Sequence, residues 1–342
     1  MNGQDPISIL DKLIQLFSYV KEETELQNEY RTSKAFDISE YRQYWKGKIR
    51  EKASREQILS NGWAFGTLEG LSTFESSVKK RDISLIYEAE QESISRTVDS
   101  IRDRIEQKVS GVIVYGHGNI KRESKFVKVA KDENLLVKSA KVFLLDASIF
   151  YHIYAQSKLN PMRNTIAPKR LKCELVDYVN TESKPVLKYL RNSLGIAQPV
   201  IHLFLGNTFA NLPEYDIKNL LDKIVRERDV VICEYKHYND EFFDDDASDH
   251  ISKMAKKSAA ELFSVPEACV SVDNECPEDD VKYTSVDVEC PREEINISFT
   301  SMLRRKFRRS ELTSGLYEHM TSNTVLNGKI RQDTYAHLRD IV

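Results

Sequence analysis

The segment Pro199–Tyr235 contains a strand pattern, a tight turn, a helix pattern and a second strand pattern in succession. Val200–Leu205 is short and almost wholly apolar, which is typical of a strand buried on both faces of a parallel sheet. The helix pattern has one apolar stripe, made by Ile217, Leu220, Leu221, Ile224 and Val225. Val230–Cys233 is again a buried-strand pattern, so the segment predicts a βαβ unit.

The same alternation of strands and helices begins at Gly111. Further strands are predicted at Val112–Tyr115, Val142–Leu145 and Lys172–Val176. Helices are predicted at Ser124–Val137, Ser148–Ser157, Lys184–Leu194 and Glu214–Val225. Repeated βαβ units pack into a parallel sheet with helices on both faces. We therefore predict an α/β, Rossmann-like fold.

The part of the chain before this core is predicted to be almost wholly helical. Phe36–Arg50 has a helix pattern, and a glycine-bearing stretch at Asn61–Ser72 predicts a loop or hinge. A long helix is predicted at Ile83–Val109. We expect its apolar stripe to pack against the sheet; the stripe consists of Ile94, Val98, Ile101 and Ile105.

The pattern changes again after Tyr235. A helix is predicted near His250–Phe263, followed by antiparallel strands at Cys269–Val272, Val281–Val288 and Ile295–Thr300. We divide the chain into a helical N-terminal region, residues 1–75, and a Rossmann-like domain, residues 76–342. Within that domain, residues around 237–310 are predicted to form a substrate-binding or auxiliary portion.

Glycines and polar side chains follow the predicted strands, where open parallel sheets bind ligands. Gly116 and Gly118 form a G-x-G turn after the first strand; such a turn admits a ligand close to the backbone, and it also occurs in plain tight turns. Asp146 ends the second strand, where a carboxylate commonly accepts hydrogen bonds from ribose hydroxyls. The alternative role for Asp146 is to cap the next helix. Gly206 and Asn207 follow the fourth strand.

The turn LGNTFANL, residues 205–212, resembles the LGSTIGNF-type turn of the histidine-specific, S-adenosylmethionine-dependent methyltransferases of the ergothioneine type. The resemblance implies a class I methyltransferase sheet and S-adenosyl-L-methionine (SAM) as the cofactor. It places Gly206, Asn207 and Thr208 against that cofactor. It places Asn211 toward the substrate, where the family's asparagine holds an α-amino group. Capping of the next helix is the alternative for Asn211.

Asp177 and Tyr178 are similar to the family's Asp-Phe pair after the third strand. In that pair the carboxylate accepts from the adenine amino group and the ring packs near the base. A turn carboxylate and a surface tyrosine are the alternative. Val114 stands where the family has an acid before the first glycine, and Met302 stands where it has the glutamate that orients histidine. The resemblance therefore does not imply histidine as the substrate.

The composition excludes several other classes of protein. The net charge is −3, which gives no general attraction to nucleic acid or to anionic membranes. No apolar run is long enough to cross a membrane, and the N-terminus has no secretory signal pattern. The five cysteines are widely spaced, without a CxxC pair, so we expect reduced thiols in a cytoplasmic protein and no metal site. His117, inside the G-x-G turn, is the histidine of most interest.

These patterns predict a SAM-dependent methyltransferase that N-methylates an amino group of a small molecule or peptide. Methyl transfer depends mainly on positioning, so no catalytic side chain is assigned. The alternative is a catalytically inactive methyltransferase-like protein that acts as a binding or regulatory module, with its helical N-terminal region contacting a protein partner. A nicotinamide-dependent oxidoreductase is disfavoured because the first turn lacks the third glycine of GxGxxG.

Overall fold

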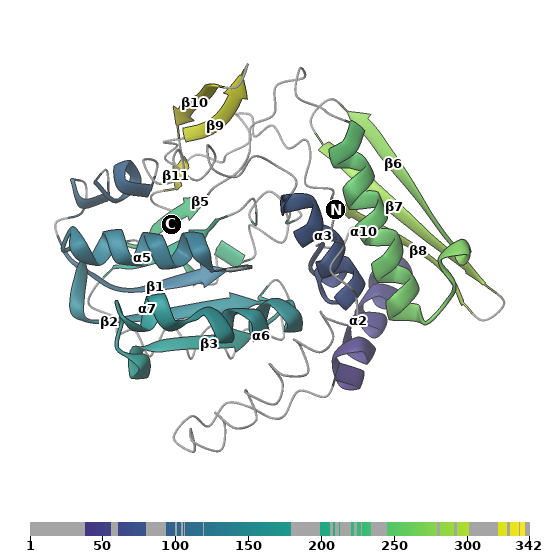
Figure 1. Ribbon diagram of the computed structural model, residues 1–342, viewed down its shortest axis with the longest axis horizontal. Coiled ribbons are helices and arrows are strands. Elements are labelled where there is room, and N and C mark those ends of the chain that lie inside the picture. The colour runs from purple at the N-terminus through teal and green to yellow at the C-terminus, as the bar shows by residue number, and fades with distance from the viewer. Residues whose placement is uncertain are drawn as a thin grey trace.

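Six strands form the main sheet of the computed structural model (Figure 1). They are β1 (Val109–Tyr115), β2 (Leu136–Asp146), β3 (Leu171–Leu175), β4 (Val200–Phe204), β5 (Val230–Cys233) and β11 (Ala336–Leu338). The structure describes residues 38–55, 61–79, 94–178 apart from 100, 104, 106 and 119, 199–205, 208, 212, 220, 221, 224–226, 228–233, 245–278, 281–290, 293–300, 321–326, 329–334 and 336–338.

The strands lie in the order β11-β5-β4-β1-β2-β3. Strands β1 to β5 are all parallel to their neighbours in this order, whereas the edge strand β11 runs antiparallel to β5. The order reverses at β1, because β2 and β3 lie on one side of it and β4 and β5 on the other. Ligands of open α/β sheets bind outside the carboxyl ends of the strands at such a reversal. The predicted α/β, Rossmann-like fold is thus confirmed.

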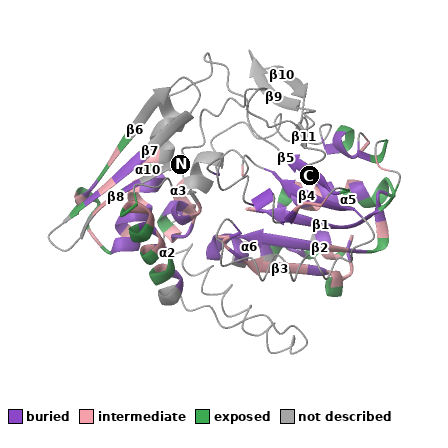
Figure 2. Cartoon of the chain, turned by 180° about the vertical axis from the view of Figure 1, so that it is seen from behind, coloured by how far each residue is buried: buried purple, intermediate pink, exposed green. Residues whose placement is uncertain are grey.

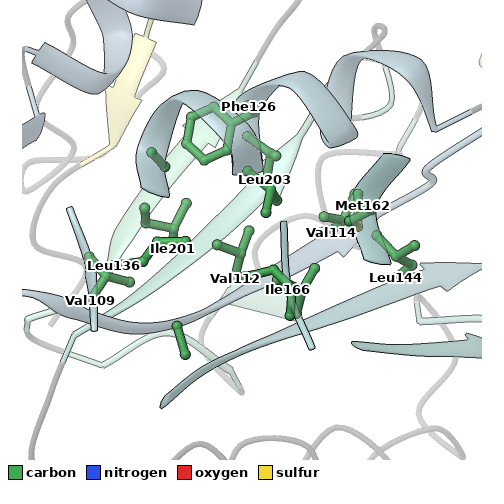
Figure 3. Close-up of a cluster of buried hydrophobic side chains, with 14 of the residues drawn as sticks. Val109, Val112, Val114, Phe126, Leu136, Leu144, Met162, Ile166, Ile201 and Leu203 are labelled. Carbon is green, nitrogen blue, oxygen red and sulfur yellow. The ribbon is translucent and has the colours of Figure 1, made fainter. Parts of the chain in front are cut away.

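Alternate strand residues supply two apolar faces, as expected for the two-residue period of a strand. One face is covered by α5 (Lys121–Asp132) and α7 (Asn160–Arg163), whose Phe126 and Met162 join the same buried cluster (Figure 3). The strand residues in that cluster include Val112, Val114, Leu144, Ile201 and Leu203. All seven residues of β1 are buried, so this strand lies at the centre of the sheet (Figure 2).

The opposite face of the sheet carries the intervening residues. Ile113, Tyr115, Phe143 and Phe204 are buried there with Leu220, Leu221 and Ile224. These last three belong to the apolar stripe predicted at Glu214–Val225, and their burial confirms these three members of it. The predicted helix at Lys184–Leu194 lies outside the described residues.

The helix before β1 ends earlier than predicted. Residues 94–99, 101 and 102 are helical, and Ile94, Val98 and Ile101 are buried against the sheet core, as expected. Val109 is instead the first residue of β1. Its N–H donates to the carbonyl of Leu135 at 2.9 Å, so the backbone is already engaged with the segment that leads into β2.

The predicted loop at Asn61–Ser72 is wrong. The segment forms a 3-10 turn, η1 (Asn61–Phe65), and the start of the helix α3 (Leu68–Lys79). Thr67 caps α3, because its Oγ1 accepts from the N–H of Gly70 at 3.1 Å. A Cβ at Gly70 would overlap Ser258 of α10 (Asp245–Phe263). The glycine therefore permits close helix packing, rather than marking a loop.

The N-terminal helices share a second core with the C-terminal part of the chain. In it α2 (Ile38–Ala53), η1, α3 and α10 pack against an antiparallel sheet of β6 (Val270–Glu278), β7 (Val281–Cys290) and β8 (Glu293–Thr300). Trp45 and Trp63 are fully buried there. The antiparallel strands are confirmed. The predicted domain boundary between residues 75 and 76 falls within α3.

The remaining described elements are short. They are α6 (Ile149–Lys158), η2 (Pro168–Arg170), η6 (Glu267–Cys269) and the antiparallel pair β9 (Thr321–Leu326) and β10 (Lys329–Thr334). Among the helices of the described residues, none combines the length and the apolar character that a membrane span requires.

Candidate functional site

The carboxyl ends of β1 and β2 are joined by one carboxylate. Asp146, the last residue of β2, accepts the Gly118 N–H at Oδ2, with an N···O distance of 3.1 Å. Its Oδ1 accepts the Ser148 N–H at 2.8 Å. A carboxylate oxygen can accept more than one hydrogen bond, so both oxygens retain acceptor capacity for a ligand. Asp146 is buried, at 6% exposure, and the structure thus brings two of the predicted site residues together.

The helix cap at this strand end belongs to a neighbouring residue. Ser148 is the N-cap of α6, and its Oγ accepts the Tyr151 N–H at 3.3 Å. Asp146 therefore does not occupy the N-cap position that was its alternative role. Its ribose-binding role remains a prediction.

The two glycines of the G-x-G turn have different surroundings. Both have positive φ, +64° at Gly116 and +49° at Gly118, a conformation that side chains rarely adopt. A Cβ at Gly116 would lie 2.7 Å from Thr208, whose side chain comes from the turn after β4. A Cβ at Gly118 would meet nothing within 4 Å. Gly116 thus packs the strand ends together, whereas Gly118 leaves open space beside Asp146.

The carboxylate after β3 is engaged by the N-terminal region. Asp177 Oδ2 accepts from the Tyr44 hydroxyl at 2.6 Å and forms an ion pair with Lys48, both on α2. The Tyr41 hydroxyl, on the same helix, donates to the carbonyl of Ala147 at 2.7 Å. Helix α2 therefore contacts the segments that directly follow β2 and β3.

Tyr178 is buried in the sheet core. Its ring meets the Tyr115 ring edge-on, with a centroid distance of 5.5 Å, and burial raises its pKa. Its hydroxyl lies beside Gly116. The contact with an adenine base stays a prediction.

The predicted residues after β4 fall largely outside the described part of the chain. Gly206, Asn207 and Asn211 are not described. Thr208 is described, and its Oγ1 donates to the Leu205 carbonyl at 2.8 Å. The fourth strand end therefore meets the first through the contact between Thr208 and Gly116.

A group that the sequence did not connect lies beside Asp146. His117 and His152 are buried, and Cys173 is partly buried; one ligand atom from each lies within 4.8 Å of the other two. Burial lowers the pKa of His152 to about 3, with a further lowering from His117. Burial also lowers the pKa of His117, against the opposing effects of Asp146 and the Gly118 carbonyl. Both imidazoles are therefore neutral at pH 7.

The comparisons with known proteins give fold neighbours only. No family model matches the sequence, and no curated protein matches it significantly. A SAM-dependent methyltransferase from Aquifex aeolicus is 11% identical over 60% of this chain and 89% of its own, with a TM-score of 0.28. A plantazolicin methyltransferase in complex with S-adenosylhomocysteine (SAH) is 14% identical over 67% and 82%, with a TM-score of 0.33. A [4+2]-cyclase is 10% identical over 53% and 58%, with a TM-score of 0.28. Similarity this low does not bear on function.

Proposed function

We propose that this chain is a SAM-dependent methyltransferase that N-methylates an amino group of a small molecule or peptide. The observation that carries the proposal is the hydrogen bond between the Gly118 N–H and the Asp146 carboxylate, with open space at Gly118. It lies beside the point where the strand order reverses, and nucleoside ligands bind at such points. The sequence resemblance of residues 205–212 supports the same class.

The described residues fit an adenosyl group in two respects. Asp146 retains acceptor capacity for ribose hydroxyls, and two backbone N–H groups donate to its carboxylate. Gly118 has no side chain to fill the space next to that carboxylate. When bound, SAM supplies an activated methyl group. The chain would then need to hold the substrate nitrogen in line and to exclude water, which α2 favours by contacting the segments that directly follow β2 and β3.

A catalytically inactive binding module is the second candidate. It is favoured by the state of Asp177, whose Oδ2 is engaged by Lys48 and Tyr44 rather than left open for an adenine amino group. Val114, where the resembled family has an acid, is fully buried in β1. In this account the helical N-terminal region would contact a protein partner.

Titration calorimetry of the untagged full chain with SAH tests the first candidate. We expect one SAH bound per chain, because SAH retains the ribose and adenine that the site would hold. Absence of binding at millimolar SAH, with the chain folded, would exclude the proposed enzyme. A stoichiometric protein complex isolated without SAM or SAH would favour the binding module. We also propose a cytoplasmic location, on the basis of the widely spaced cysteines.

A further inference from the structure

We propose that His117, His152 and Cys173 form a zinc-binding site that includes the middle residue of the G-x-G turn. The proposal does not depend on the proposed methyltransferase activity. The three residues come from different elements: His117 from the turn after β1, His152 from α6 and Cys173 from β3. Imidazole nitrogen and thiolate sulfur are the donor types that zinc prefers in proteins.

The two separations between the Cys173 sulfur and the imidazole nitrogens match the N···S edges of a zinc tetrahedron. Bond lengths of about 2.1 Å to nitrogen and about 2.3 Å to sulfur give an N···S edge of roughly 3.6 Å at the tetrahedral angle. The Cys173 sulfur lies 3.7 Å from Nε2 of His117 and 3.4 Å from Nδ1 of His152. The two imidazole nitrogens lie within 4.8 Å of each other, so the three donor atoms are grouped closely enough to share one zinc ion.

The surroundings of His117 orient the nitrogen that a metal needs. Its Nδ1 lies 3.0 Å from the Gly118 carbonyl oxygen, which can only accept a hydrogen bond. The ring proton therefore belongs on Nδ1, and the lone pair of Nε2 points toward Cys173. The Asp146 carboxylate is 3.7 Å from the same Nδ1. A backbone carbonyl and a carboxylate behind a histidine are the usual outer partners of a metal-binding imidazole.

A thiol–imidazole hydrogen bond is the competing explanation of these contacts. The Cys173 thiol has one proton, so it can donate to only one of the two imidazoles. If it donates to His117, then His152 must carry its own proton on Nδ1 and donate to the sulfur. This arrangement would satisfy the three groups without a metal, and it predicts that the folded chain takes up no zinc.

Zinc binding at this site would release a proton and would hold three elements of the fold together. The Cys173 thiol loses its proton to solvent as the zinc–sulfur bond forms, so one proton is released for each ion. Three protein donors leave a fourth position for water. Because His117 lies between Gly116 and Gly118, the ion would fix the G-x-G turn to α6 and β3.

Titration of the metal-free full chain with Co²⁺ and then Zn²⁺ tests the proposal. We expect one Co²⁺ per chain, with the intense visible bands of tetrahedral cobalt and a thiolate-to-cobalt charge-transfer band, and displacement of Co²⁺ by Zn²⁺. Cys173→Ser should remove the charge-transfer band and weaken Zn²⁺ binding at least tenfold. Cys269→Ser is the matched control, because Cys269 is also a partly buried free cysteine but lies in η6.

Two results would overturn the proposal. One is a folded wild-type chain that binds no Co²⁺ or Zn²⁺ at a stoichiometric level. The other is a charge-transfer band that survives in Cys173→Ser and disappears in Cys269→Ser. Because the wild-type titration is decisive without any variant, the proposal stays testable even if Cys173→Ser does not fold. A His152→Gln variant supplies a second substitution, with the same expected loss of affinity.

Discussion

The two glycines of the G-x-G turn differ in their surroundings, since Gly116 is closely packed and Gly118 faces open space. Alanine substitutions should therefore affect stability differently at the two positions. Gly116→Ala should lower the free energy of unfolding by about 2–4 kcal/mol, because it adds overlap with Thr208 to the cost of positive φ. Gly118→Ala should cost only about 1 kcal/mol, since a Cβ there meets open space. Urea unfolding of both variants measures the difference. Equal losses of stability would contradict the different packing of the two glycines.

Acid should destabilise the metal-free chain through its buried histidines. The folded pKa of His152 is about 3, below the value of about 6.5 expected when unfolded, and the pKa of His117 is lowered too. As the pH falls below about 6.5, the unfolded chain therefore binds more protons than the folded chain, and this lowers the free energy of unfolding. For His152 the stabilisation is complete above about pH 6.5 and is lost as the pH falls toward 3, by up to about 1.4 kcal/mol per pH unit, and His117 acts in the same direction.

Urea unfolding in the presence of a chelator, at several pH values between 7 and 4.5, measures this loss of stability. His152→Gln cannot titrate, so its stability should depend less steeply on pH than that of the wild type. An unchanged slope in this variant would show that His152 is not held neutral in the folded chain.

Individual site residues could be predicted from the sequence where a polar or charged side chain directly follows a buried strand. Asp146 was identified because a carboxylate directly follows a buried apolar run, and its contact with Gly118 agrees with that position. His152 and Cys173 were not connected to His117, because they are 35 and 56 residues away from it and the pattern has no CxxC spacing. Only the parallel order of β1, β2 and β3 brings the three residues together.

At the scale of elements, helix α2 is fixed to the end of β3 by the ion pair between Lys48 and Asp177. Their side chains are 15% and 8% exposed. Lys48→Met should lower the free energy of unfolding by about 1–3 kcal/mol, because it leaves a largely buried carboxylate without its cation. Arg55→Met is the matched control, since the Arg55–Glu51 pair is 61% and 57% exposed and should contribute less than about 0.5 kcal/mol.

Urea unfolding of the two variants gives the comparison directly. If Lys48→Met lowers the free energy of unfolding no more than Arg55→Met does, the ion pair between Lys48 and Asp177 does not anchor helix α2. The helix pattern at Phe36–Arg50 predicted α2 itself. It could not predict where the helix docks, because Lys48 and Asp177 are 129 residues apart and neither belongs to an apolar stripe.

The same limit explains the error at Asn61–Ser72. Glycines in a sequence usually indicate a loop, but Gly70 is required by its close contacts with the Ala64 carbonyl of η1 and with Ser258 of α10. The contact with α10 joins segments almost 200 residues apart, as the hydrogen bond between Thr67 and Ser258 illustrates at 3.0 Å. Local patterns predicted the strands well because burial on both faces leaves a continuous apolar run.

At the scale of the whole molecule, the N-terminal helices and the sheet should unfold together. Both tryptophans of the chain lie in the core formed by α2, η1, α3 and α10. This core is tied to the end of β2, because the Ser148 hydroxyl donates to the Phe65 carbonyl at 2.6 Å and Tyr41 donates to Ala147. Tryptophan fluorescence reports on the N-terminal core, whereas far-ultraviolet circular dichroism reports on the entire chain.

We therefore expect the two signals to give the same urea midpoint. Coincident transitions are the mark of a single cooperative unit. A fluorescence change at lower urea would mean that the N-terminal helices separate first, as an independent region ending near residue 75 would do.

The central claim is that the ends of β1 and β2 hold an adenosyl group through Asp146, and calorimetric titration with SAH tests it most directly. The wild-type chain should bind one SAH, and Asp146→Ala should bind it more weakly by about 1.5–3 kcal/mol, roughly 10- to 150-fold. Ser148→Ala removes the cap of α6 and the hydrogen bond to the Phe65 carbonyl, so it should lose about 1–3 kcal/mol of stability while keeping the wild-type affinity. No binding of SAH by the folded wild-type chain, or equal affinity in Asp146→Ala, would contradict the claim.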